Sequence, residues 1–181
     1  MPRLLGFLTI VTLTLAAPCS SSAQRGSPST PQAAEAPAPW SAAPLTRADV
    51  PAVYLTEWRK APNRTTCAVL APASLGEGAG GVPRAAVFTG GWAIAYDRAG
   101  VRSAFGIAGS GSVPDSTTYD AWPNKIRWAD GSSVGYGPEG GTGPNQLAYL
   151  RVAGQRCLYN VWSRLGVAHL EFLLSQLRFT E

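Results

Sequence analysis

The sequence predicts an α+β domain in which an antiparallel sheet of about five to seven strands is packed by a long C-terminal amphipathic helix. Two observations carry this prediction. Short segments rich in β-branched and aromatic residues follow one another with turn residues between them, as in successive hairpins. The last part of the chain then repeats its apolar residues at a helical period. Because parallel strands need long crossovers, closely spaced hairpins favour an antiparallel meander.

The strands are expected where apolar and small residues alternate between turn signals. Asp97–Gly100 and Asp130-Gly131 are typical turn sequences. The expected strands cover residues 66–70, 85–89, 92–96, 101–108, 125–128, 133–136 and 147–152. Ahead of them, Thr46 can cap a short helix over residues 47–59, with Pro51 tolerated only near its first turn.

The C-terminal helix is expected over residues 155–179. At 100° per residue one arc collects Leu158, Val161, Trp162, Leu165, Ala168, Phe172 and Leu173. Asn160, Arg164, Glu171 and Arg178 fall on the opposite side, so this helix should lie on a sheet face and form most of the core. The single histidine, His169, lies on the apolar arc, where a hydrogen-bonded core histidine is the expected role. A catalytic dyad with Asp97, Asp120 or Asp130 is the alternative.

Three parts follow one another along the chain. In residues 1–19, Arg3 precedes an uncharged apolar run over 4–17 that is too short to span a bilayer, as in a secretory signal peptide. Residues 20–44 are rich in Ser, Ala and Pro and are expected to form a disordered tether. A plain tether is the favoured interpretation, and docking of Trp40 on the domain is the alternative. Residues 45–181 are long enough for one globular domain.

Cys19 ends the apolar run. Leu15, Ala16, Ala17, Pro18 and Cys19 resemble a bacterial lipobox, in which the cysteine is lipidated and becomes the mature N-terminus. Pro18 stands where that pattern expects a small residue, and cleavage after Ala23 is the alternative. Since three cysteines leave one unpaired, Cys19 is favoured as the lipidation site. We therefore expect an exported protein, held as a lipoprotein in the periplasm or on the outer face of a membrane, or otherwise secreted.

Cys67 and Cys157 are the two cysteines of the predicted domain. In an oxidising compartment they are expected to form a disulfide, with Cα atoms about 4.4–6.8 Å apart. A catalytic thiol is the alternative. It would need a second cysteine in a Cys-X-X-Cys motif or a neighbouring histidine, and neither is visible in the sequence.

Charge and composition argue against several function classes. The formal net charge is +4, but the arginines are dispersed rather than clustered, so no nucleic-acid partner is expected. One histidine and two domain cysteines do not suggest a metal site. The glycine-rich runs 106–112 and 135–143 are not followed by Gly-Lys-Ser/Thr, so they are expected to be loops rather than phosphate cradles, and no cofactor is predicted.

The candidate functional residues lie in and between those glycine-rich runs. Tyr119, Trp122, Trp128 and Tyr136 are candidates for a sugar-type binding surface, although filling the core is the favoured role. The sequence thus predicts a non-enzymatic envelope module that binds a protein or a polymer. The alternative is a cell-envelope glycan hydrolase, with two carboxylates as acid and base. Its candidate carboxylates are Asp97, Asp115, Asp120, Asp130 and Glu139.

Overall fold

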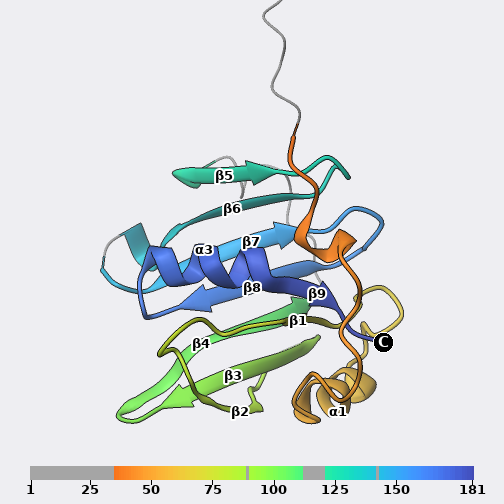
Figure 1. The fold of residues 1–181 in the computed structure, drawn as a ribbon, viewed down its shortest axis with the longest axis horizontal. Coiled ribbons are helices and arrows are strands. Elements are labelled where there is room, and N and C mark those ends of the chain that lie inside the picture. The colour runs from red at the N-terminus through yellow and green to blue at the C-terminus, as the bar shows by residue number, and fades with distance from the viewer. Residues whose placement is uncertain (1–34, 89, 112–120, 142) are drawn as a thin grey trace, which may run out of the picture. The chain divides into compact units, whose positions relative to one another are not determined.

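The computed structural model describes residues 35–88, 90–111, 121–141 and 143–181 (Figure 1). Cys19, the signal segment and residues 20–34 lie outside these ranges. The fold is α+β, as predicted, and seven antiparallel strands form its main sheet. Across the sheet the strands follow the order β2 (Val82–Ala85), β3 (Trp92–Arg98), β4 (Val101–Ser110), β8 (Leu158–Ser163), β7 (Gln146–Arg151), β6 (Ser133–Pro138) and β5 (Asn124–Arg127).

The sheet consists of two meanders joined at its centre. β2, β3 and β4 form one, while β5, β6, β7 and β8 form the other, and β8 pairs with β4. The described residues also form the 3-10 turns η1 (Pro39–Ser41) and η2 (Glu139–Gly141), the helices α1 (Val53–Lys60) and α3 (Val167–Gln176), and the short paired strands β1 (Leu70–Pro72) and β9 (Leu177–Phe179). Figure 1 shows α3 lying across the middle strands of the sheet, where it contacts β7 and β8.

The C-terminal helix packs on the sheet but is shorter than predicted. Residues 158–163, assigned from the sequence to its first half, instead form β8, which pairs with β4 and β7. Tyr159, Val161 and Trp162 favour a strand, and two sheet neighbours offer that segment a full set of backbone hydrogen bonds. Gly166, whose φ is 98°, stands at the break between strand and helix, a conformation that glycine adopts at little cost.

Other element boundaries also moved. The first helix starts at Val53, after Pro51, rather than at residue 47, because proline has no N–H for an interior helical bond. Thr46 instead closes a turn with Asp49, whose carboxylate accepts hydrogen bonds from the Thr46 amide and hydroxyl. The strands expected over 66–70 and 85–89 are β1 at Leu70–Pro72 and β2 at Val82–Ala85.

One sheet face is sealed by α3 and forms the core; we call it the covered face. On β8, Tyr159 and Val161 point into this core, and they are buried together with Phe105 of β4. α3 contributes Leu170, Leu173 and Leu174, all buried. Every second residue of these strands points to the same face and packs against the apolar side of α3, which is the usual way in which a helix covers a sheet.

The predicted disulfide is present. Cys67 and Cys157 are bonded, with their Cα atoms 5.3 Å apart and 90 positions apart in sequence. The bond joins the turn ahead of β1 to the residue just before β8. Trp58 of α1 donates its indole N–H to the Cys67 carbonyl at 2.8 Å, so the disulfide, α1 and the sheet are held together.

The described end of the predicted tether packs on the domain. Trp40 is buried and its ring meets Trp128 edge-on at 5.0 Å between centroids. Its indole N–H donates to Asp130 at 2.9 Å, and the Ala129 amide donates to the Ala36 carbonyl at 3.0 Å. Docking through Trp40 therefore fixes residues 36–41 over the turn between β5 and β6. In the described part of the chain, no helix has the length and apolar character needed to cross a membrane.

Candidate binding site on the open face of the sheet

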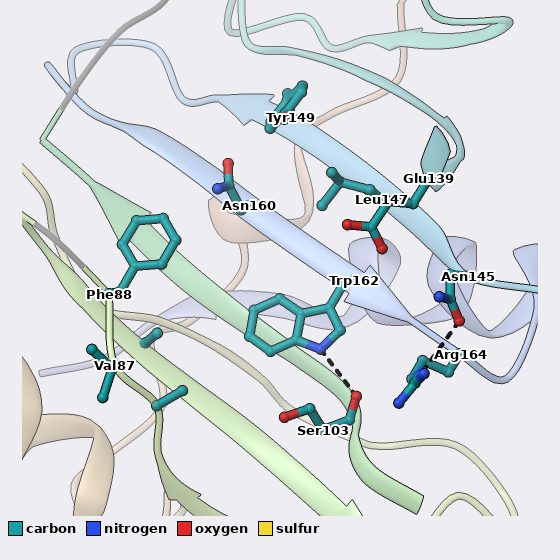
Figure 2. Close-up of a pocket in the computed structure, with 12 residues that line it drawn as sticks. Val87, Phe88, Ser103, Glu139, Asn145, Leu147, Tyr149, Asn160, Trp162 and Arg164 are labelled. Carbon is teal, nitrogen blue, oxygen red and sulfur yellow. Dashed lines mark hydrogen bonds between the residues drawn. The ribbon is translucent and has the colours of Figure 1, made fainter. Parts of the chain in front are cut away.

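The face of the sheet opposite α3 carries a second, different set of side chains; we call it the open face. Asn160 and Trp162 of β8 alternate with the core residues of that strand, and Leu147 and Tyr149 do the same on β7. All four are partly exposed. Figure 2 shows them on the side of the sheet away from α3, which lies behind the strands.

Strand register arranges this face in two rows, because directly paired residues of antiparallel strands share a face. The first row runs Ala93, Ala108, Asn160, Tyr149, Gly135 and Lys125, and the second runs Ala95, Gly106, Trp162, Leu147 and Gly137. In both rows small residues flank the larger side chains of β7 and β8. The small residues are themselves buried, with Gly106 beneath Trp162 and Gly137 beneath Trp122 and Pro123.

Trp162 is seated on the backbone of β4. A Cβ atom at Gly106 would overlap the six-membered ring of the indole, so the ring occupies the space that any larger residue would fill. The indole N–H donates to the Ser103 carbonyl at 3.4 Å. With its inner side on the strand and its side chain half-buried, Trp162 presents its outer side to the groove.

The Ser103 carbonyl that receives this bond is positioned by a strained residue. Ser103 has a φ of 51°, which costs free energy for a residue other than glycine. Asp97 compensates by accepting the Ser103 amide at 2.7 Å, and Arg84 donates both to Asp97 at 2.8 Å and to the Ser103 hydroxyl at 2.7 Å. The hydrogen bond from Arg84, followed by that from the Ser103 amide, lowers the pKa of Asp97.

A groove of about 540 Å³ lies along this surface. Its middle is formed by Trp162, Asn160, Leu147 and Tyr149, one end by Glu139, Asn145 and Arg164, and the other by Ala86, Val87 and Phe88, with Ala93 and Ser103 completing the lining. Arg164 is held at its end by donating to Asn145 at 3.2 Å and to the Arg102 carbonyl at 3.1 Å. The groove thus combines aromatic surface with oriented amide, carboxylate and guanidinium groups.

A second hollow of about 470 Å³ adjoins the groove at Tyr149, which lines both. Trp122 lies in this hollow and meets Tyr149 edge-on, with 5.5 Å between ring centroids. Gly137 makes room for it, because a Cβ there would press on Trp122 and Pro123. Two tryptophans, each seated over a glycine of the sheet, therefore flank Tyr149.

Asn160 is the polar residue in the middle of the groove lining. Its Oδ1 atom is covered from solvent and has no hydrogen-bond partner. A buried acceptor without a donor costs about 1–3 kcal/mol, and such atoms in folded proteins call for an explanation. Asn63 Oδ1, Trp92 Nε1 and Thr180 Oγ1 are in the same state elsewhere in the described residues, so the covered Asn160 oxygen does not by itself mark a ligand site.

The four aromatic residues proposed from the sequence do not lie together. Trp122 lines the second hollow, whereas Trp128 and Tyr136 are buried on the covered face. Tyr136 donates its hydroxyl to Glu171 of α3 at 2.7 Å; burial, together with that carboxylate, raises the pKa of Tyr136 to about 12. Tyr119 lies outside the described residues.

Sequence reasoning missed Tyr149, Asn160 and Trp162 as site residues. Trp162 was expected on the apolar side of a helix, and Asn160 on the polar side of the same helix. The alternation of Tyr159 and Val161 with Asn160 and Trp162 was the available signal. A period of two would have placed the latter pair on the face opposite the core.

The candidate acids of a hydrolase are distributed over the fold. Asp97 supports Ser103, and Asp130 binds Trp40 and the amide and hydroxyl of Ser132. Burial opposes the ionisation of Asp130, but these hydrogen bonds outweigh it and lower its pKa. Glu139 lines the groove, while Asp115 and Asp120 lie outside the described residues. The described acids therefore include one carboxylate at the groove.

His169 belongs to the covered face. Its Nε2–H donates to the Leu75 carbonyl at 3.0 Å, which leaves Nδ1 to accept the Ser163 hydroxyl at 2.9 Å. Ser163 is fully buried and also accepts the Leu165 amide at 3.0 Å. Burial is the largest cause that lowers the pKa of His169. The hydrogen bond to the Leu75 carbonyl raises this pKa, and the positive charge of Arg98 lowers it further. This serine–histidine pair is a structural contact that ties α3 to β8, with His169 itself partly exposed.

Comparison with known proteins adds no relative. No protein-family model, curated protein or solved structure matches the chain. Within the described ranges, no group of three or more His, Cys, Asp and Glu side chains is placed to hold a metal ion. The function is therefore argued from the open face itself.

Proposed function

We propose that this protein is an exported, non-enzymatic binding module of the bacterial cell envelope, and that its ligand lies along the open face of the sheet. The observation that carries the proposal is the groove formed by Trp162 and Tyr149 on a face that none of the described helices covers. Concave sites with aromatic walls and a few oriented polar groups are where proteins usually bind ligands. Trp162 lies on β8 within the sheet, and Trp122, just ahead of β5, packs over Gly137; such support keeps a site preorganised.

The groups of the groove suit recognition. Asn145 and Asn160 offer amides, Arg164 a guanidinium and Glu139 a carboxylate, all of which form directed hydrogen bonds. A hydrolase with paired carboxylates would have to bring Asp115 or Asp120 to Glu139, and no described contact favours that second function.

Export is proposed from the N-terminal sequence. Residues 1–19 resemble a signal peptide, which would direct export, and Cys19 lies in a lipobox-like sequence, which would attach the lipid anchor. The Cys67–Cys157 disulfide is compatible with an oxidising compartment. Intact-mass measurement on protein from a membrane fraction tests this. A chain that begins at Cys19 with a diacylglyceryl group is expected, and a soluble chain that begins at Gln24 would refute the lipid anchor.

Binding is tested by sedimenting the mature chain, with Cys19 left unlipidated, together with isolated cell envelopes. We expect Trp162→Ala to lose most of the bound fraction, because it removes the platform of the groove. Phe172→Leu is the matched control, since Phe172 is an exposed aromatic residue on α3. Asn160→Ala provides a smaller change at the same site. If folded Trp162→Ala and Asn160→Ala proteins both sediment like the wild type, the open face is not the binding surface.

A further inference from the structure

We infer that the ligand of the open face is an uncharged glycan strand, whose pyranose rings stack on Trp162 and Phe88 and whose hydroxyls bind between Arg164 and Glu139. The inference rests on the proposed function and gives the ligand its chemical class. Two separate parts of the groove support it. One is a platform of flat aromatic rings, and the other is a pair of opposite charges held at one end.

The rings of Trp162 and Phe88 form the platform. Figure 2, which looks onto the open face, shows both rings in open outline, so their flat sides face the groove, whereas the ring of Tyr149 is seen nearly edge-on. Both side chains are partly exposed, and Trp162 is supported from below by the backbone at Gly106. A pyranose ring with equatorial substituents carries its C–H groups on its flat sides. Those C–H groups match the electron-rich face of an aromatic ring, so two such faces suit successive sugar rings.

Asn145 positions the two charged groups at the other end of the groove. The Glu139 amide donates to the Asn145 carbonyl at 2.8 Å, and Nε of Arg164 donates to the Asn145 side-chain oxygen at 3.2 Å. Nη1 of Arg164 also donates to the Arg102 carbonyl at 3.1 Å. Among the described residues, Nη2 of Arg164 and the Glu139 carboxylate have no hydrogen-bond partner. A fixed donor and a neighbouring acceptor are therefore both offered to a ligand.

This charge balance favours an uncharged ligand. Among the described residues that line the groove, Arg164 is the cation and Glu139 is the carboxylate, so neither sign is in excess. A nucleic-acid strand, by contrast, depends on an excess of cations for its phosphates. A sugar hydroxyl can accept from a guanidinium and donate to a carboxylate at the same time. One hydroxyl, or two on neighbouring carbons, therefore satisfies both groups.

The position of the groove on the face of the sheet disfavours a peptide. Extended peptides bind sheets mainly through main-chain hydrogen bonds at an exposed edge. β7 and β8, which carry the middle of the groove, are paired with a neighbouring strand on both sides, so their backbone groups are occupied. Side chains alone remain for recognition, as a glycan requires. A proline-rich peptide also docks in aromatic grooves, so the experiment compares it directly with the glycan.

The test titrates the mature chain, with Cys19 unlipidated, with cellohexaose and with the N-acetylglucosamine hexamer, by calorimetry and ¹H–¹⁵N NMR. Both are uncharged, flat strands with equatorial ring substituents. We expect one or both to bind, to shift the indole N–H signal of Trp162 and to leave that of buried Trp128 unchanged. Maltohexaose is the matched control for cellohexaose. It should bind more weakly, because the same glucose units form a curved chain that does not lie flat on both rings.

Variants assign the contacts. Trp162→Ala is expected to weaken binding of the tighter hexamer by about tenfold or more, as central aromatic contacts do, and Phe88→Ala should weaken it as well. Arg164→Gln and Glu139→Gln should each weaken it by about threefold to tenfold, because each removes a charge-assisted hydrogen bond. Phe172→Leu, which changes an exposed aromatic residue on α3, is the matched control and should leave the affinity unchanged.

Each contrary outcome overturns the inference in a distinct way. Failure of both uncharged hexamers to shift the Trp162 signal would reject the glycan class. Tighter binding of a galacturonic acid hexamer would show that the ligand is acidic, and tighter binding of an alanine–proline hexapeptide would show that it is a peptide. Equal affinity for maltohexaose would reject stacking of a flat strand. The proposed function would still be decided separately, by whether Trp162→Ala releases the protein from isolated envelopes.

Discussion

The two faces of β8 show how one strand can serve two tasks. Tyr159, Val161 and Ser163 point to α3, where each is buried. Asn160 and Trp162, between them in sequence, line a groove on the other side. On the covered face Ser163 is satisfied by His169 and Leu165, although the buried indole N–H of Trp92 has no partner there. On the open face Asn160 and Trp162 remain partly exposed beside the groove. The difference in exposure separates residues that hold the fold from residues that a ligand could reach.

The largest expected effect comes from emptying the covered face. Phe105 is fully buried between β4 and α3, where its ring meets His169 edge-on at 4.9 Å. Phe105→Ala should lower the free energy of unfolding by about 3–5 kcal/mol, because it leaves a cavity in the core. Leu147→Ala, on the open face, should cost far less stability but weaken envelope binding. Urea unfolding measures the first effect and sedimentation with envelopes the second. Equal losses of stability would break the distinction between the faces.

Removal of the disulfide should come next. Cys67→Ser or Cys157→Ser is expected to cost about 2–5 kcal/mol, because the bond closes a long loop in the unfolded chain. The double variant should cost about the same as either single variant, since all three remove one bond. A reducing agent should reproduce the loss in the wild type, as followed by the melting temperature. An unchanged melting temperature under full reduction would contradict this account of the fold.

Mild acid should weaken the covered face to a smaller extent. The pKa of His169 is lowered in the folded protein, so the unfolded chain binds a proton more readily. Above the unfolded pKa of about 6.5, His169 is neutral in both the folded and the unfolded chain, so its burial carries no protonation penalty. The free energy of unfolding falls as the pH drops below that value. Unfolding midpoints at pH 7.5 and pH 5 measure this. His169→Gln should flatten the difference, because His169 is the single histidine of the chain.

The carboxylates act in a different pH range. The pKa values of Asp49 and Asp97 are lowered, each chiefly by a hydrogen bond to its carboxylate. Their contribution is present above an unfolded pKa of about 3.9 and is lost as the pH falls through the lower folded values. A stability loss confined to pH values below 4, with none between 7.5 and 5, would contradict the role given to His169.

The smallest expected effect on stability comes from the open face. Trp162→Ala should cost about 1 kcal/mol, because the half-buried indole loses only part of its apolar contact. Trp162→Ala should nevertheless reduce envelope binding more than Phe105→Ala does. Both variants are compared at a temperature where both are folded. A loss of several kcal/mol would show that Trp162 belongs to the core.

How far the sequence predicts this molecule can be followed along β8 and α3. Apolar spacing and turn residues correctly predicted an antiparallel sheet and the C-terminal helix on it, and the cysteine count of an exported domain correctly predicted the Cys67–Cys157 bond. Period analysis failed at residues 158–163, because a short apolar run fits a helix and a strand equally well until its sheet neighbours are known. Trp162 and Asn160 were therefore assigned to a helix.

The site was harder to predict than the fold. Tyr149 and Trp162 meet through pairing between β7 and β8, and the space for Trp162 is made by Gly106 on β4. Such contacts depend on the register in which the strands pair, and a local sequence pattern does not determine that register. Trp128 shows the converse case, because its burial depends on Trp40, which lies 88 positions away in sequence within the expected tether.

The central claim is that the ligand lies on the open face, and site-specific photo-crosslinking in living cells tests it most directly. A benzoylphenylalanine probe would replace Tyr149 on the open face and, in a second strain, Phe172 on α3. We expect light-dependent adducts from the probe at position 149, which decrease sharply when Trp162→Ala is added, and little adduct from position 172. Adducts that form equally at both positions, or at 172 alone, would contradict the account.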